Sequence, residues 1–169
     1  MSIEIYHCEH SRGMRPIWTA EELGLEYSVQ MLPFPPRVYK KEFLKKNILG
    51  TIPYMIDGSV KMTESVAMSQ YIVDKYGPSK LQVNKTESDY GNYLNWLHHS
   101  DATLTFPQTV FMRYKLQEPG IADNAATGYR KWFVARLRLL EKELADREFL
   151  CCDRFTIADI CVGYALYLS

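Results

Sequence analysis

The sequence lacks the features that would assign it to several specialised classes of protein. No stretch approaches the run of about 18 apolar residues that a transmembrane helix needs, so no membrane-spanning segment is expected. The 20 basic and 20 acidic residues cancel, which gives no electrostatic reason to expect nucleic acid or an anionic membrane as a partner. The N-terminus, MSIEIYHCEH, also lacks the basic and then apolar pattern of a secretory signal.

Paired cysteines and metal-binding histidines are lacking as well. The four cysteines have no disulfide or zinc-ligand spacing: Cys8, Cys151, Cys152 and Cys161. Free thiols indicate a reducing compartment, and we therefore expect the protein in the cytoplasm. The four histidines have no metal-ligand partners at matching spacing, so no metal site is predicted: His7, His10, His98 and His99.

What is present is the composition of a folded globular protein, 47% apolar and 24% charged, in 169 residues. That length suffices for one ordinary domain or two small ones. Residues 1–78 alternate between strand and helix patterns in the order β-α-β-α-β-β-α. The predicted segments are a strand near 3–6, a helix over 15–24, a strand near 27–32, a loop over 33–36 and helical turns at 42–46. A hairpin over 54–62 is predicted to turn at Asp57-Gly58. The helix that follows has an apolar stripe formed by Met68, Tyr71, Ile72 and Tyr76. This order predicts a small mixed sheet with helices packed on it.

The character of the chain changes after the stop signal Gly77-Pro78. Residues 79–86 are polar and are interpreted as a linker, and residues 87–169 show only helical periods, which predicts an all-α domain. Its predicted stripes are Tyr90, Leu94, Leu97 and Leu104, broken by Pro107, and then Phe133, Leu137, Leu140 and Leu144. A last helix begins at Thr156 and reaches Ser169 without a cap, so we expect that C-terminal residues are missing.

Two short motifs in the first domain are open to a structural and a functional interpretation. Ile52-Pro53 precedes a strand, either as a plain turn or, if the bond is cis, as a bend that exposes the Ile52 backbone to pair with a peptide ligand. Glu64-Ser65 opens a helix. Ser65 is either an ordinary N-cap or part of an anion site at the helix N-terminus, with Glu64 available for an ammonium group.

Together these motifs are far more specific than either is alone. Their order resembles the glutathione site of glutathione transferases, on a thioredoxin-like domain. The matching segments are residues 42–47, 50–53, 63–68 and 155–160, the last as a capping box formed by Thr156 and Asp159. The resemblance covers essentially the whole chain and departs at Ile48, where the family often carries proline. It suggests a serine-type class, theta-like or a related bacterial one.

This resemblance implies a set of glutathione contacts. Ile52, ahead of Pro53, would bind the cysteinyl backbone, while Glu64 and Ser65 would bind the γ-glutamyl head. A cation for the glycine carboxylate would come from Lys40, Lys41 or Lys46. Asp101 would reach glutathione across a dimer interface, with a purely structural acid as the equal alternative.

The hydroxyl that activates the thiol is predicted to be Ser11, with Tyr6 as the alternative. Ser11 stands four residues before Arg15, as in the serine-type classes. With Ser11 as a helix cap, Pro16 would be the fifth helical residue, where proline is disruptive, so we expect a helix beginning near Arg15 and Ser11 in the loop. Cys8 is interpreted as a small, half-buried residue instead of a redox cysteine.

The function implied is conjugation of the glutathione thiolate to a small, apolar electrophile by a homodimer. His10 and Arg12, with Phe106, Phe111 and Tyr114, are candidates to line the pocket for this second substrate. Two alternatives stay open: another glutathione reaction, such as isomerisation, ether cleavage or peroxide reduction, and a non-catalytic glutathione-binding or scaffold protein. The sequence does not name the electrophile.

Overall fold

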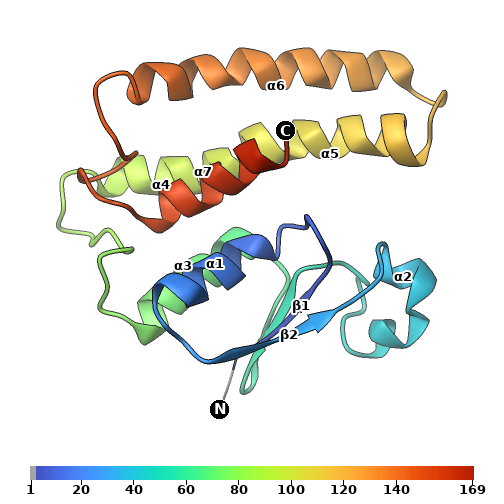
Figure 1. The fold of residues 1–169 in the computed structure, drawn as a ribbon, viewed down its shortest axis with the longest axis horizontal. Helices are drawn as coiled ribbons and strands as arrows, with labels where there is room; N and C mark the ends of the chain where they lie inside the picture. Colours follow the sequence, from blue (N-terminus) through green and yellow to red (C-terminus); the bar gives the residue numbers. More distant parts are fainter. Residues whose placement is uncertain (1–2) are drawn as a thin grey trace. The chain divides into compact units, whose positions relative to one another are not determined.

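The computed structural model describes residues 3–169, which form two compact units divided between Gln82 and Val83. The first unit contains β1 (Ile3–His7), α1 (Met14–Glu22), β2 (Tyr27–Met31), α2 (Pro36–Tyr39), the 3₁₀ helix η1 (Lys41–Lys45), β3 (Tyr54–Asp57), β4 (Val60–Met62) and α3 (Ser65–Tyr76). The predicted order β-α-β-α-β-β-α is therefore confirmed (Figure 1).

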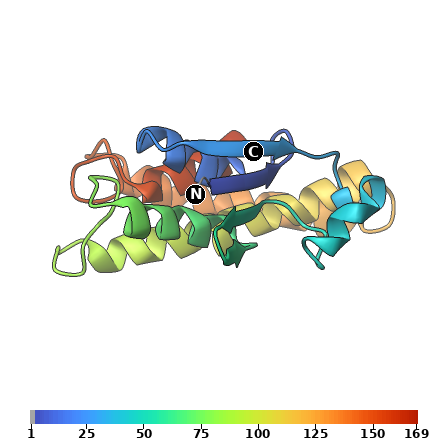
Figure 2. The same cartoon turned by 90° about the horizontal axis from the view of Figure 1, so that it is seen from below.

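The first unit is built on a four-stranded sheet in the order β2-β1-β3-β4. Strand β1 pairs with β2 in parallel, as Figure 2 shows, and with β3 in antiparallel orientation; β3 and β4 form the hairpin. Alternate side chains of β1 enter different clusters, because successive residues of a strand point to opposite faces. Ile3 and Ile5 pack with Met55, Met68 and Ile72, whereas Tyr6 packs with Phe43 and Tyr54.

Two local predictions in this unit are corrected. The residues between the hairpin strands are Gly58 and Ser59, not Asp57 and Gly58, because Asp57 still pairs with Val60 in the ladder. Gly58 has a φ of 61°, which glycine adopts without the strain of a Cβ atom. The segment 33–36 is not wholly loop, since Pro36 is the first residue of α2, a position where proline is tolerated.

A polar cluster fastens the hairpin to α3. The buried carboxylate Oδ2 of Asp57 accepts hydrogen bonds from the hydroxyls of Tyr71 and Tyr76, at 3.0 and 2.7 Å, and from Lys75 Nζ at 2.7 Å. Burial alone raises the pKa of Asp57, but the bonds from Lys75, Tyr76 and Tyr71 outweigh it, so the pKa lies below its ordinary value of 3.8. Asp57 is thus held ionised at neutral pH.

We predict that Asp57→Asn lowers the free energy of unfolding by about 2 kcal/mol at pH 7, because charge-assisted hydrogen bonds are lost. A native pKa that is depressed stabilises the fold above the ordinary pKa, and that stabilisation disappears as the pH falls through the native value. The difference between variant and wild type should therefore shrink as the pH is lowered from 4 towards about 2. Urea unfolding across this range measures this difference, with Asp74→Asn at an exposed position of α3 as control. A difference that is the same at all these pH values would contradict the role assigned to Asp57.

The second unit is all helical, as predicted. It contains α4 (Tyr90–His98), the π-helical η2 (His99–Thr105), α5 (Phe106–Met112), the π-helical η3 (Arg113–Gln117), α6 (Asp123–Glu143) and α7 (Ile157–Tyr167). Helix α6 packs along α5, and α7 packs against α4 and η2. Within residues 3–169, no helix combines the length and the apolar character needed to cross a membrane. The segment 79–86 has no helix or strand, yet Leu81 and Val83 in it are buried.

The prediction that Pro107 breaks the first helical stripe is wrong, because the helical path continues from α4 through η2 into α5. The wider turn of η2 lets the N–H of Phe106 reach the carbonyl of Asp101. Pro107 then falls at the second residue of α5, within the first turn, where its missing N–H is tolerated. The buried face also includes Tyr93 and Trp96, which the predicted stripe omitted.

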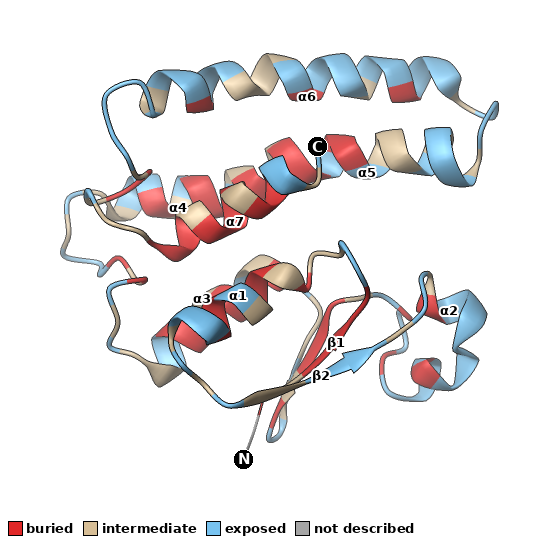
Figure 3. Ribbon diagram, in the orientation of Figure 1, coloured by how far each residue is buried: buried red, intermediate tan, exposed pale blue. Residues whose placement is uncertain are grey.

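Helix α7 is buried along most of its length, whereas α6 is largely exposed (Figure 3). The predicted capping box at the start of α7 is confirmed. Thr156 Oγ1 accepts from the N–H of Ala158, and Asp159 accepts from the N–H of Thr156 at 2.8 Å. Asp159 also accepts from the N–H of Leu150 at 2.9 Å, so this carboxylate ties the preceding loop to the helix start.

Candidate functional site

The strand pairing brings three predicted site segments to one edge of the first unit's sheet. Because β3 runs antiparallel to β1, with Tyr6 opposite Tyr54, the segment entering β3 lies near the end of β1. Because β4 runs antiparallel to β3, with Met55 opposite Met62, the segment leaving β4 returns to the same edge. The loops that contain Ser11, Ile52-Pro53 and Glu64-Ser65 therefore start from the same edge of the sheet.

Ser11 lies in the loop between β1 and α1 and is partly exposed. Helix α1 begins at Met14, one residue before the predicted start, with Gly13 at the N-cap position. Ser11 is thus not the N-cap of α1, and Pro16 is the third helical residue, as the helix rules require. The neighbouring His10 has a φ of 57°, an uncommon conformation for a residue with a side chain. The loop presents the Ser11 hydroxyl two residues ahead of a helix N-terminus.

The Ser11 hydroxyl contacts a histidine that the sequence analysis did not include in the site. Ser11 Oγ lies 2.9 Å from His7 Nδ1, a hydrogen bond whose direction depends on the tautomer of His7. His7 ends β1 and is 8% exposed. Burial, with a smaller contribution from His10, lowers the pKa of His7 below 6.5, so the ring is neutral at pH 7. The spacing of four residues across a strand end was the only sequence signal for this pair.

Arg15 links the first helix to the Glu64-Ser65 motif. Its side chain is fully buried, and Nη1 donates a hydrogen bond of 3.0 Å to Ser65 Oγ. Arg15 is predicted at the helix start, but no local sequence pattern predicts this partner, which is 50 residues away. The bond fixes the position of the Ser65 hydroxyl relative to the loop that carries Ser11.

The start of α3 has the features of an anion site. Glu64 occupies the N-cap position with extended backbone, and its side chain makes no capping hydrogen bond to a described backbone N–H. Ser65 is the first helical residue, so the interpretation of Ser65 as a plain N-cap is wrong. Since the first N–H groups of a helix lack intrahelical partners, they can bind a carboxylate, and the exposed Glu64 carboxylate can bind an ammonium group. The Ile52-Pro53 bond is cis, and Ile52 is partly exposed.

The alternative hydroxyl, Tyr6, lies in a different environment. Tyr6 is 5% exposed and packs against Phe43 and Tyr54, with ring centroids 5.3 and 5.9 Å away. Its hydroxyl accepts a hydrogen bond from Lys46 Nζ. Lys40 pairs with Glu42 at 2.8 Å, and Lys41 is exposed.

The cysteines are free thiols, and burial disfavours the ionised form of Cys8 and Cys151. Cys8 is buried, and burial raises the pKa of its thiol. Burial raises the pKa of Cys151 to about 12. Such thiols are poor nucleophiles at neutral pH. Among residues 3–169, no group of three or more His, Cys, Asp or Glu side chains is arranged to hold a metal ion.

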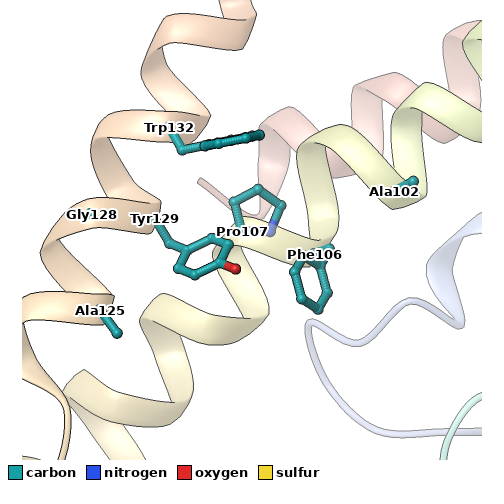
Figure 4. Close-up of a pocket in the computed structure, with 7 residues that line it drawn as sticks. All are labelled: Ala102, Phe106, Pro107, Ala125, Gly128, Tyr129 and Trp132. Carbon is teal, nitrogen blue, oxygen red and sulfur yellow. The ribbon is translucent and has the colours of Figure 1, made fainter.

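The second unit contains an apolar pocket of about 430 Å³ (Figure 4). It is lined by Ala102, Phe106, Pro107, Ala125, Gly128, Tyr129 and Trp132. Of the three aromatic residues predicted to line a pocket, Phe106 lines this one, edge-on to Tyr129, and Phe111 and Tyr114 do not. Its size and lining suit a small apolar molecule. Asp101 is partly buried in η2 and has interaction partners of its own.

Comparison with known proteins finds the same resemblance. Residues 5–80 match the family model for the glutathione S-transferase N-terminal domain. Glutathione S-transferase 3 of Schizosaccharomyces pombe is 25% identical over 175 residues, covering 93% of this chain and 70% of its own. Glutathione S-transferase 1 of the same yeast is 29% identical over 161 residues, covering 89% and 69%.

Solved structures agree with the sequence matches. The glutathione transferase URE2P8 from Phanerochaete chrysosporium, solved with oxidized glutathione, superposes with a TM-score of 0.87 at 25% identity, covering 99% of this chain and 78% of that one. The glutathione transferase URE2P6 from the same fungus, in complex with oxidized glutathione, gives a TM-score of 0.84 at 29% identity, covering 99% and 81%. These matches support a member of the glutathione transferase family and do not specify a subclass. The predicted fold, a thioredoxin-like sheet followed by a helical part, is confirmed.

Proposed function

We propose that this chain is a glutathione transferase that binds glutathione on its first unit and activates the thiol with Ser11. The match of residues 5–80 to the glutathione S-transferase N-terminal domain and the two fungal structures solved with oxidized glutathione support glutathione as the co-substrate. The observation that carries the proposal is the meeting of Ser11, Ile52-Pro53 and Glu64-Ser65 at one edge of the sheet.

Each part of glutathione has a chemical counterpart among these residues. The γ-glutamyl head is an α-amino acid. Its carboxylate suits the N-terminus of α3 and the Ser65 hydroxyl, and its ammonium suits Glu64. The Ile52 backbone is proposed to pair with the cysteinyl backbone as an added strand would. Lys41 is the better cation for the glycine carboxylate, because Lys40 is already paired with Glu42.

Activation requires a thiolate, and one hydroxyl is sufficient in energetic terms. A free thiol has a pKa of about 8.5, and lowering it by about two units takes about 2.7 kcal/mol. A hydrogen bond to a charged acceptor contributes about 1.5–3 kcal/mol, and a nearby helix N-terminus adds about 0.3–1 kcal/mol. Ser11, in the loop before α1, combines both contributions. Tyr6 is the weaker candidate, since its hydroxyl is engaged by Lys46 within an aromatic cluster.

The proposed reaction is attack of the thiolate on a carbon of a small, apolar electrophile, which forms a thioether. A halide then leaves as the anion, or the oxyanion or enolate formed from an epoxide or enone takes up a proton from water. We also propose a cytoplasmic homodimer, since free buried thiols suit a reducing compartment and closed twofold symmetry is the commonest assembly. In this homodimer, Asp101 is proposed to contact the glutathione that is bound to the second copy of the chain.

The test is to titrate the purified protein with glutathione by calorimetry and to assay it against a panel of electrophiles. The panel should contain 1-chloro-2,4-dinitrobenzene, an epoxide, an enone and a hydroperoxide. We expect saturable glutathione binding and conjugation of at least one carbon electrophile. Binding without turnover across the panel would overturn the enzymatic part of the proposal, and no binding would overturn it entirely.

A further inference from the structure

The contact between His7 and Ser11 constrains how the thiol can be activated. Ser11 Oγ and His7 Nδ1 are 2.9 Å apart, which is hydrogen-bonding distance. A serine hydroxyl has one proton to donate. If that proton is directed at the sulfur of glutathione, it cannot also be directed at His7. The short contact is then favourable only if His7 supplies the proton between the two atoms.

We propose that His7 is the positioning residue of Ser11, with its proton on Nδ1, donating to Ser11 Oγ while Ser11 donates to the glutathione thiolate. This inference rests on the proposed function, because it takes Ser11 as the donor to sulfur. A neutral imidazole carries its one N–H on either nitrogen, so the Nδ1–H form is available to His7 without a change of charge. Hydrogen bonding from His7 also makes Ser11 a stronger donor, since chained hydrogen bonds polarise one another.

The surroundings of His7 hold its ring in this position. The backbone of His7 is fixed in the sheet, where its carbonyl accepts from the N–H of Leu32 at 2.7 Å. On the other side, the backbone at Gly13 lies directly against the ring: a Cβ atom on Gly13 would come within 2.4 Å of His7 Nδ1. Any larger residue at this position must therefore displace the imidazole or the loop. Glycine at position 13 therefore allows the N-terminal end of α1 to pack directly against the His7 ring.

Two backbone donors near Ser11 lie farther from its hydroxyl than His7 does. The backbone N–H groups of Cys8 and Gly13 lie 3.5 and 3.4 Å from Ser11 Oγ, at the limit of hydrogen bonding. His10, which is exposed in the same loop, adds a smaller contribution than burial to the lowering of the pKa of His7. At 2.9 Å, the contact with His7 is shorter than the contacts of Ser11 Oγ with these two N–H groups.

The direct test is the tautomer of His7 by long-range ¹H–¹⁵N correlation spectroscopy of protein labelled with ¹⁵N-histidine. The signals of His7, one of four histidines, are identified by their loss in His7→Asn. With glutathione bound, we expect the signature of an imidazole protonated at Nδ1. A signature of protonation at Nε2, with Nδ1 as acceptor, would overturn the proposal.

Variants give a second readout, the absorbance near 240 nm of the thiolate of bound glutathione. His7→Leu should reduce the thiolate fraction at pH 7 and lower kcat about tenfold, the size of one lost hydrogen bond. Affinity for S-methylglutathione, which has no thiol, should be unchanged. His7→Asn, whose amide places a donor near the position of Nδ1, should stay within about threefold of wild type. His98→Leu, the same replacement at an exposed histidine of α4, is the control.

Gly13→Ala perturbs the same pair without changing either residue, and it provides the test if His7→Leu does not fold. Like His7→Leu, it should lower the thiolate fraction, because the added methyl group displaces the imidazole from Ser11. A wild-type thiolate fraction in folded His7→Leu and Gly13→Ala would overturn the role of His7. Failure of the unmodified protein to bind S-methylglutathione would instead overturn the proposed function, so the two failures are distinguished.

Discussion

Replacing Ser11 with alanine should lower kcat/KM for conjugation of 1-chloro-2,4-dinitrobenzene by roughly 10- to 100-fold, because a hydrogen bond to a charged sulfur is lost. The pKa of the bound thiol should rise towards the value of about 8.5 for a free thiol. Ser11 caps no helix and makes only local contacts, so the fold should be unaffected. Affinity for S-methylglutathione, measured by calorimetry, should therefore remain near that of wild type.

Tyr6→Phe is the matched control for Ser11→Ala, since it removes the rival hydroxyl and keeps the ring in its aromatic cluster. We expect less than a threefold effect on kcat/KM, in keeping with loss of one hydrogen bond to Lys46 away from the reacting sulfur. If Ser11→Ala retained full activity while Tyr6→Phe abolished it, the assignment of the hydroxyl would be wrong.

Replacing Arg15 with methionine should lower the free energy of unfolding by about 3 kcal/mol and weaken glutathione binding at the same time. Arg15 is fully buried, and a methionine of similar length cannot donate to Ser65 Oγ. The Ser65 hydroxyl then loses the bond that fixes its position at the start of α3. Urea unfolding and calorimetry with S-methylglutathione measure the two effects.

Arg37→Met is the control for Arg15→Met, because Arg37 is an exposed arginine of the same unit. It should change stability by no more than about 0.5 kcal/mol. Ser65→Ala should reproduce the loss of affinity with a smaller loss of stability. Unchanged stability and affinity in Arg15→Met would contradict the linking role of Arg15.

The elements of the first unit could be predicted because their signals are local. The alternation around Ile3 and Ile5 and the helical stripe of Met68 and Ile72 each depend on a few neighbouring residues, and all four side chains are buried. The capping box at Thr156 is also local, and its predicted geometry is found. By contrast, the continuation of the helix past Pro107 depends on a π turn, for which the sequence has no comparable short-range pattern.

The contacts that support the candidate site could not be predicted, because they join distant or unpatterned residues. The bond from Arg15 to Ser65 spans 50 residues, and it follows from the packing of α1 beside α3. The contact of His7 with Ser11 depends on a loop whose path is set by the close approach of Gly13. Residue types at Ser11, Glu64 and Ser65 suggested a site, whereas the residues that position them became visible only in three dimensions.

A crystal structure of the protein with glutathione would show whether Ser11 activates glutathione bound at Glu64 and Ser65. We predict the γ-glutamyl head at the start of α3 and the sulfur within hydrogen-bonding distance, about 3–3.5 Å, of Ser11 Oγ. A sulfur beside Tyr6, or a head group bound away from Glu64 and Ser65, would contradict this proposal.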